Sequence, residues 1–432
     1  MKPQHWFRWL VVQGTPRLVL KTYARRGDPV AQLMSSPEAV HDPIPLLESL
    51  RASGRLVLSP VGWASADHEI VRTILRDTSF GVAAAEGFVP TPLRPMLDRL
   101  ELPPNPVQPP SMLVIDPPDH TRMRKPVASA FTPRAIRRLR DRVESVTSEL
   151  LDALPPRGAA DLVSDFAAQV PIAIISEMLG FPDSDRKHFL AWGDAVSPML
   201  DIGISWPTTR AASKAIVEMD RYLDAHIARL RREPGEDILS GLVASGDLDD
   251  RELKASATLL MGAGFETTVN LISNGVVQLV NHREQLHRLR DDPELWPNAI
   301  EEVLRFDSPV QNTGRIAGHD TELAGVRIRK GNTVVLSLAG ANRDPDVFTD
   351  PHRFDVTRAN AKEHLTFSSG IHVCLGASLA RMEGTHALRA LFERFPDLVL
   401  AGIPRRRPLF TLHGYSRLPV LLGQRAAQTS AV

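Results

Sequence analysis

Cysteine is almost absent from this sequence: Cys374 is the only one among 432 residues. A single cysteine excludes an internal disulfide bond, which is typical of a protein kept in a reducing compartment such as the cytoplasm. A net charge is absent too, because 51 basic residues balance 51 acidic ones. The totals therefore give no sign of nucleic-acid binding or of a bulk attraction to membranes, and they favour a neutral small molecule as partner.

Long hydrophobic runs are also missing. Arg8, Gln13 and Arg17 interrupt the apolar amino-terminal segment well before the roughly 18 residues that a membrane span requires. We expect no transmembrane anchor, and we expect residues 1–25 to form an arm packed on the protein body. A weak peripheral membrane helix is the alternative. Residues 423–432 are small and polar and are expected to be loose.

Linkers, internal repeats and low-complexity segments are lacking, so we expect one domain over residues 1–432. Helical periodicity dominates, and strand signals are short and few, which predicts a mainly α fold with small β-sheets (α+β). The clearest predicted helices are residues 143–154, 172–179, 211–232 and 254–280. The predicted strands are residues 55–60, 315–317, 326–328, 333–338 and 418–422.

Cys374 lies where a loop that starts near Phe367 leads into a helical pattern. On its own, a lone cysteine is most often a small buried apolar residue. At the first turn of a helix, however, free N–H groups and the helix dipole would stabilise a thiolate. Gly370 and Gly376 remove side chains on both sides of the sulfur, where a flat ligand would need the backbone to come close. His372 can reach an anionic edge of such a ligand.

This segment resembles the haem-binding loop of the cytochrome P-450 monooxygenases. The family pattern is Phe, two residues, Gly, one residue, His or Arg, one residue, Cys, one residue, Gly, and residues 367–376 fill every fixed position. Ser368 stands where many bacterial members carry glycine. The resemblance runs from about Pro43 to Val420 and is in detail similar to the soluble bacterial branch. It implies a triangular, helix-rich domain that holds haem b between a long distal helix and the loop of Cys374, the iron ligand, with Phe367 and Gly376 as further haem contacts.

The resemblance also implies an activity. A member of this family takes two electrons from a ferredoxin and its ferredoxin reductase, splits O2 and inserts one oxygen atom into an apolar small molecule. A cytoplasmic location without a transmembrane anchor is expected for the bacterial branch. Two alternatives stay open: a peroxide-driven haem peroxygenase, and a non-catalytic haem sensor or carrier.

The segment 254–280 is apolar nearly all round, which predicts a helix buried in the centre of the protein. Glycine and threonine weaken its middle, where the hydroxyl of Thr267 can bond back to the carbonyl of Ala263 and open a groove. The carboxyl of Glu266 is unusual in so apolar a segment. A kinked core helix is the structural alternative, but the resemblance implies that Glu266 and Thr267 form the catalytic acid and alcohol pair that relays protons, and that Ala263 and Gly264 contact the haem.

Glu302 and Arg305 stand three residues apart on a predicted helix that ends before Pro309, so their side chains can meet. Their helical angle predicts a surface pair. The resemblance implies a buried structural cluster instead, completed by an arginine from a later loop, for which Arg353 is the candidate.

The two carboxylates of a haem need cations or hydrogen-bond donors. His120 and Arg124 are four residues apart on a predicted helix and therefore share a face. On their own they are most simply a solvated pair, but they match the propionate-binding segment of the family, and Arg315 and His372 match two more such contacts. Pro126 should kink this helix and limit the reach of Arg124.

Two further groups of residues complete the expectations. The first is a basic run that is most simply a solvated helix face but that could receive an acidic ferredoxin: Arg122, Lys125, Arg134, Arg137, Arg138, Arg140 and Arg142. The second is a set of substrate contacts above the haem: Val310, Gln311, Asn312, Phe410 and Thr411. Loops at residues 82–110 and 190–208 should set substrate choice, and they carry no motif that names the substrate.

Overall fold

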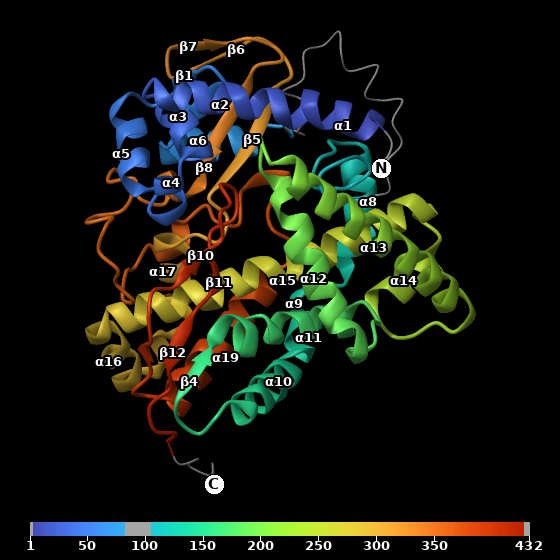
Figure 1. Cartoon of the computed structure of the whole chain (residues 1–432), viewed down its shortest axis with the longest axis vertical. Helices are drawn as coiled ribbons and strands as arrows, with labels where there is room; N and C mark the ends of the chain where they lie inside the picture. Colours follow the sequence, from blue (N-terminus) through green and yellow to red (C-terminus); the bar gives the residue numbers. More distant parts are fainter. Residues whose placement is uncertain (1–2, 83–104, 427–432) are drawn as a thin grey trace.

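The computed structural model describes residues 3–82 and 105–426, and these residues make up the fold. Figure 1 shows the amino-terminal helices and the largest sheet at one end of the molecule, with the long helix α15 (Asp250–Asn281) crossing the middle. Most of the other helices lie around α15. Most of the predicted substrate loop 82–110 falls outside the described residues.

The amino-terminal part combines short helices with a five-stranded sheet of order β1-β2-β8-β5-β3. Strands β2 and β8 are parallel and the other pairs are antiparallel. The strands are β1 (Val57–Ser59), β2 (Gly62–Ser65), β3 (Phe80–Val82), β5 (Asn312–Ala317) and β8 (Thr333–Ser337). The helices are α1 (Pro3–Trp9), the π-helical turn η1 (Leu10–Gly14), α2 (Thr15–Arg25), α3 (Pro29–Ser35), α4 (Pro37–His41), α5 (Ile44–Ala52) and α6 (His68–Arg76).

The larger part of the chain is helical. Its helices before α15 are α8 (Asp119–Ser129), α9 (Pro133–Arg138), α10 (Arg140–Ala153), η4 (Val163–Ala167), α11 (Gln169–Met178), α12 (Arg186–Val196), η6 (Ser197–Leu200), α13 (Trp206–Arg232) and α14 (Ile238–Ser245). After α15 come α16 (Arg283–Asp291), α17 (Trp296–Phe306), α18 (Leu338–Ala341) and α19 (Ala377–Arg394). Short 3-10 turns are η5 (Asp183–Asp185), η7 (Pro293–Leu295), η8 (Ala361–Glu363) and η9 (Gly370–His372).

Three small sheets complete the fold. One has three strands in the order β4-β12-β9, and the other two are the pairs β6-β7 and β10-β11. These strands are β4 (Ala159–Asp161), β6 (Thr321–Leu323), β7 (Val326–Ile328), β9 (Val399–Leu400), β10 (Arg405–Arg406), β11 (Tyr415–Arg417) and β12 (Pro419–Leu421).

The main core forms around α15, which packs against α11, α17 and α19. A capping box fixes the start of α15. The side chain of Asp249 accepts a hydrogen bond from Glu252 N–H, and the side chain of Glu252 accepts one from Asp249 N–H. Burial along most of its length explains why its sequence is apolar all round. The predicted fold class, mainly α with small sheets, is therefore confirmed.

Both ends of the described chain are fixed to the body. Residues 3–25 are helical, and the indole of Trp9 donates to the carbonyl of Ile204 (3.0 Å). The expectation of a loose tail from residue 423 is wrong for its first part, because Arg425 donates to the carbonyl of Leu151 (2.6 Å) and Ala426 N–H to that of Arg394 (2.9 Å). Among the described residues, no helix is both long and apolar enough to cross a bilayer.

Candidate active site

Cys374 lies in a tight loop and not in the helix that follows it. Helix α19 begins at Ala377 with Gly376 as its N-cap, so the expectation that Cys374 occupies the first helical turn is wrong. Cys374 N–H donates to the carbonyl of Phe367 (2.8 Å), which closes the loop on itself. The guanidinium of Arg381 lies 4.5 Å from the ring centre of Phe367 and stabilises the ring by a cation–π interaction.

The environment of the sulfur does not favour a free thiolate. Burial raises the pKa of the Cys374 thiol, although a hydrogen bond from Gly376 and the charges of Arg124 and Arg381 lower it. Part of the Cys374 side chain is accessible to solvent. Protein atoms nevertheless surround the sulfur closely enough to disfavour its charged form, which raises the pKa. A metal ion deprotonates a coordinated thiol outright, so this sulfur suits a metal ligand better than a free nucleophile.

The two glycines of the loop, Gly370 and Gly376, have different surroundings. Gly370 has φ +74°, and a Cβ there would lie 2.4 Å from the carbonyl oxygen of Leu75 in α6. Glycine is therefore required at position 370 by the neighbouring protein backbone. The expectation that it makes room for a flat ligand is wrong. Next to Gly376, in contrast, there is open space where a Cβ would point. Ser368 adopts φ +62°, a conformation that glycine takes more easily.

Hydrogen bonds tie the loop to helix α17. Asn342 accepts from Leu365 N–H (2.7 Å), and the Thr366 hydroxyl donates to the carbonyl of Leu304 (2.7 Å). Glu301 of α17 accepts from Arg381 of α19 (2.6 Å) and contacts His364 (3.1 Å). Burial opposes ionisation of Glu301, but these two partners hold its pKa at about 2. Sequence reasoning missed Glu301. Its only sequence signal is that it directly precedes Glu302.

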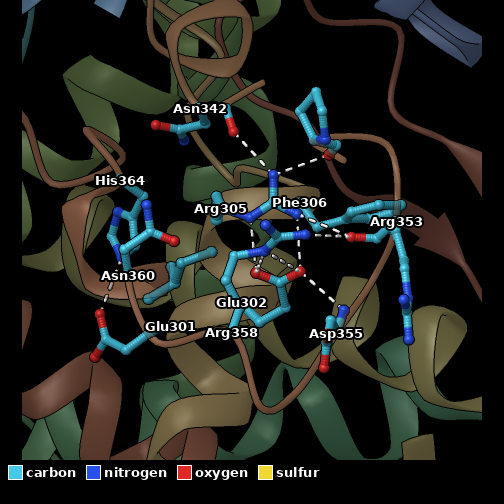
Figure 2. Close-up of polar contacts among 12 residues, drawn as sticks. Glu301, Glu302, Arg305, Phe306, Asn342, Arg353, Asp355, Arg358, Asn360 and His364 are labelled. Carbon is cyan, nitrogen blue, oxygen red and sulfur yellow. Dashed lines mark hydrogen bonds and ion pairs between the residues drawn. The ribbon is translucent and has the colours of Figure 1, made fainter. Parts of the chain in front are cut away.

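Glu302 and Arg305 form a fully buried ion pair beside these contacts (Figure 2). Arg305 donates from Nε (2.7 Å) and Nη2 (2.8 Å) to the two carboxylate oxygens of Glu302. The prediction that the side chain of Arg353 completes the cluster is wrong. Arg353 is exposed and contributes only its carbonyl, to Arg305 (3.2 Å), whereas the guanidinium of Arg358 lies 3.2 Å from Glu302.

Four basic side chains from three segments, α8, β5 and the cysteine loop, gather near Cys374. The rings of His120 and His372 lie 4.2 Å apart between centroids, and Arg124 donates to the carbonyl of Val373 (2.5 Å). Helix α8 continues through Pro126, so the proline does not keep Arg124 from the loop, contrary to the expectation. Arg315 of β5 is buried, and burial lowers its pKa to about 10.

This cluster has unsatisfied polar atoms. Both ring nitrogens of His120 and Nε2 of His372 are buried without a hydrogen-bond partner among the described residues. Burial and the neighbouring His120, Arg315 and Arg124 lower the pKa of His372 to about 3. The carboxylate of Asp116 lies 3.9 Å from His372, beyond hydrogen-bond distance. Such a group of donors fits an anionic ligand.

The middle of α15 presents an open face inside the fold. Ala263 is exposed and Gly264 and Thr267 are partly exposed, whereas most of the helix is buried. The Thr267 hydroxyl donates to the carbonyl of Ala263 (2.8 Å). Gly264 meets Ile175, which a Cβ would approach to 3.1 Å, so its small size serves helix packing.

Glu266 is buried on another face of α15, in contact with Arg407 from the carboxyl-terminal part. Arg407 Nε lies 3.1 Å from Glu266 Oε1, and Arg407 Nη1 donates to Asp194 of α12 (2.6 Å). Burial raises the pKa of Glu266 to about 7, although Arg407 lowers it. Asp194 is exposed, so the three side chains lead from the centre of the fold to solvent. Sequence reasoning found Glu266 but neither of its partners.

A second buried acid lies close by. Glu383 of α19 is fully enclosed, and burial raises its pKa to about 8 against a hydrogen bond from Thr268. It was missed because it follows the helical period of a core helix, with no local signal for a carboxyl group.

Comparison with known proteins decides the family. The family model for cytochrome P-450 matches residues 86–404. A putative cytochrome P-450 140 of Mycobacterium tuberculosis is 45% identical over 433 residues, which cover 98% of this chain and 98% of the relative. The chain belongs to the cytochrome P-450 family.

Other P-450 proteins support this. The 6-deoxyerythronolide B hydroxylase of Saccharopolyspora erythraea is 42% identical over 316 residues, covering 71% of this chain and 76% of the relative. The ligand-free crystal structure of CYP164A2 from Mycobacterium smegmatis matches with a TM-score of 0.83 at 36% identity, covering 91% of this chain and 99% of that one. The chain is thus an oxidoreductase of the monooxygenase type, with the haem and the dependence on O2 and an electron donor that the family has.

The residues described above fit a haem. Its iron would find Cys374 as a ligand, and its two carboxylates would find the unsatisfied donors of His120 and His372 together with Arg124 and Arg315. Ala263, exposed on the open face of α15, would be available to contact the haem.

The predicted substrate contacts come together only in part. Segments 310–312 and 410–412 lie side by side, joined by a bridge between Val310 and Leu412. The side chains of Gln311 and Asn312 donate to the carbonyls of Ser308 (2.7 Å) and Phe410 (3.1 Å). Phe410 packs on the amino-terminal core cluster. Val310 likewise packs on a core cluster and the Thr411 hydroxyl donates to the carbonyl of Leu200 (3.2 Å), so the substrate contacts stay a prediction.

The predicted basic face is smaller than its sequence suggests. Arg122 pairs with Glu252 (2.5 Å) and Arg142 with Glu177 (2.6 Å), so these two charges are largely compensated. Five cations on or near α8, α9 and α10 are exposed: Lys125, Arg134, Arg137, Arg138 and Arg140.

Proposed function

We propose that this P-450 hydroxylates, or oxidises in a related way, an apolar small molecule, using haem b with Cys374 as the iron ligand. The observation that carries the proposal is the cluster of His120, Arg124, Arg315 and His372 beside a cysteine loop, a set of donors that suits two carboxylates next to a metal-binding sulfur. Haem, when bound, supplies the iron at which O2 is activated. The protein supplies orientation, charge and protons.

In this proposal, Glu266 and Thr267 of α15 deliver protons on the side of the haem opposite Cys374, where O2 would bind. A pKa of about 7 lets the Glu266 carboxyl both hold and release a proton near neutral pH. Arg407 stays protonated and carries no proton itself, but together with the exposed Asp194 it extends a line of polar side chains from Glu266 to the solvent with which the carboxyl exchanges protons. The Thr267 hydroxyl, bonded to the carbonyl of Ala263, stands on the open face of the helix and can pass a proton onward.

We assign a structural role to Glu302, Arg305 and Arg358, which hold the segment before the cysteine loop. We further propose that the chain acts as one domain in the cytoplasm and that its electron donor is a ferredoxin, served by a ferredoxin reductase. The exposed cations on α9, which packs against α19 behind the cysteine loop, support an acidic partner.

The test is the spectrum of the reduced protein with carbon monoxide. We expect the absorption band typical of thiolate-bound haem, and we expect Cys374→His to change it to the spectrum of imidazole ligation and to abolish turnover. Protein that carries no porphyrin, or a variant spectrum identical to that of the native protein, would contradict the assignment.

A peroxide-driven peroxygenase and a non-catalytic haem protein are the alternatives. The buried Glu266 with its polar link to solvent favours the monooxygenase, because reduction of O2 takes up two protons from solvent, whereas peroxide brings its own and a carrier needs none. Turnover with ferredoxin, reductase and O2 should exceed turnover with peroxide. Efficient reaction with peroxide alone would favour the peroxygenase, and no reaction with either would favour the carrier.

A further inference from the structure

The amino-terminal helical arm carries charge of one sign only. The arm comprises α1, η1 and α2, residues 3–25. No aspartate or glutamate occurs before Asp28, whereas lysine or arginine occupies positions 2, 8, 17, 21, 25 and 26. Because the charges of the whole chain cancel, this segment is a local positive region.

The inner face of the arm is fixed to the protein. Val12, Gln13 and Leu20 are buried. The Gln13 side-chain oxygen accepts from the N–H groups of Gly203 (2.6 Å) and Ile204 (3.2 Å). The arm is therefore a docked helix whose outer face has a defined orientation, and not a free tail.

The outer face exposes large apolar side chains. Trp6 is 48% exposed, Phe7 41%, Leu10 36% and Leu18 68%. In a regular α-helix, Leu18 would point about 80° away from Leu10, at 100° per residue. The π-helical turn Leu10–Gly14 adds one residue to a turn and reduces this offset to about 20°. The irregular turn thus aligns the apolar side chains along one face.

Cations flank this apolar line. Lys21 and Arg25 are exposed and follow Leu18 at spacings of three and seven residues, so they share its side of α2. Figure 1 shows α1 and α2 at the amino-terminal end of the molecule, beside the largest sheet. A helical face with exposed aromatic and aliphatic side chains, cations beside them and no anion in the arm is complementary to a broad surface that is apolar inside and negatively charged at its boundary.

We propose that the outer face of residues 3–25 binds peripherally to an anionic lipid bilayer. Trp6, Phe7, Leu10 and Leu18 enter the boundary between headgroups and acyl chains, while Lys21 and Arg25 bind the anionic headgroups. This goes beyond the proposed oxidation and does not depend on it.

The test is flotation of the haem-loaded full-length protein with vesicles. We expect binding to phosphatidylcholine vesicles that contain phosphatidylglycerol, weak binding to phosphatidylcholine alone, and release by high salt. Leu18→Ser should weaken binding at least about tenfold. The double variant Lys21→Gln/Arg25→Gln should weaken it about thirtyfold, at about fivefold for each cation.

Matched controls are available on other surfaces. Ile403→Ser removes an aliphatic side chain that is 83% exposed, and Lys330→Gln with Lys362→Gln removes two exposed cations outside the arm. Both controls should bind vesicles as the native protein does. An unchanged haem spectrum and thermal midpoint in each variant separate lipid binding from folding.

Three results would overturn the proposal: no flotation, equal flotation with neutral vesicles, or equal losses in the arm variants and the controls. Slower reduction by ferredoxin in the arm variants without any vesicle binding would assign the face to a protein partner instead. Flotation is scored without turnover, so its failure is distinct from a failure of the proposed oxidation.

Discussion

The guanidinium Nε of Arg407 lies 3.1 Å from Oε1 of Glu266, in contact but outside hydrogen-bonding geometry. The pair joins the centre of α15 to the carboxyl-terminal part of the chain. Burial has the larger effect on the carboxyl group and raises the pKa of Glu266 to about 7, while Arg407 acts in the opposite direction. Protonated and ionised forms of Glu266 therefore coexist near neutral pH.

The first prediction concerns stability and pH. Because the folded pKa of Glu266 lies above the unfolded value of about 4.5, the native state binds more protons between those two values, and the stability that the protonated carboxyl gives is lost as pH rises through this window. Relative to Glu266→Gln, the native protein should lose about 3 kcal/mol of unfolding free energy between pH 4.5 and 7. Urea unfolding across this range measures the difference. Glu236→Gln, at an exposed glutamate, is the control, and parallel curves for native protein and Glu266→Gln would contradict the prediction.

The second prediction concerns Arg407. Removing its charge in Arg407→Gln should move the pKa of Glu266 further upward, because the nearby positive charge that favours the carboxylate is lost. The midpoint of the stability change assigned to Glu266 should then shift to higher pH. Arg405→Gln, which alters an exposed arginine two residues earlier, should leave the midpoint in place. An unchanged midpoint, or a shift to lower pH, would contradict the prediction that Arg407 lowers the pKa of Glu266.

The sequence predicted the parts of the site that follow a helix or a contiguous motif. The helix 254–280, observed as α15, was visible from its apolar residues, and the back-bond of Thr267 to Ala263 follows from a spacing of four. The short strands β2 and β3 were missed because glycine, alanine and serine weaken their strand signal, whereas the equally short β7 was predicted at residues 326–328 from its valine and isoleucine. Cys374 was placed in the helix because the apolar period starts at Leu375, while Gly376 ends the loop two residues later than that period indicates.

Partners from distant segments could not be predicted in the same way. Arg353 and Arg358 both stand in the loop after Asp350, and their spacing says nothing about which one turns inward. The backbone decides it: Asp350 adopts φ +47°, the carbonyl of Arg353 faces Arg305, and the guanidinium of Arg358 faces Glu302. Arg407 and Asp194 meet Glu266 from segments 141 and 72 positions away in the sequence, for which a single sequence holds no signal.

The third prediction compares these two arginines. Arg358→Ala should cost about 2 kcal/mol of unfolding free energy, because a hydrogen-bonded cation is removed from the buried carboxylate of Glu302. Arg353→Ala removes an exposed side chain and should change stability by less than about 0.5 kcal/mol. Arg305→Ala should cost about 3–5 kcal/mol and leave little haem-loaded protein. Urea unfolding and the haem content after purification measure these effects, and equal losses for Arg353→Ala and Arg358→Ala would refute the corrected cluster.

The fourth prediction concerns Ser368 in the cysteine loop. Its φ of +62° costs a side chain that has a Cβ about 1–2 kcal/mol, and its hydroxyl has no partner among the described residues that would offset this. Ser368→Gly removes the backbone strain but makes the unfolded chain more flexible, so the net gain should be about 0.5–1 kcal/mol in the haem-loaded protein.

Ser368→Ala separates the two causes. It removes the hydroxyl and keeps the Cβ, so it should give no gain if backbone strain is the reason. Thermal unfolding followed at the haem absorption band measures all three proteins. If the alanine variant gains as much stability as the glycine variant, the cost lies in the unpaired hydroxyl and not in the backbone. The presence of serine where many bacterial members carry glycine would then have little to do with the conformation of the loop.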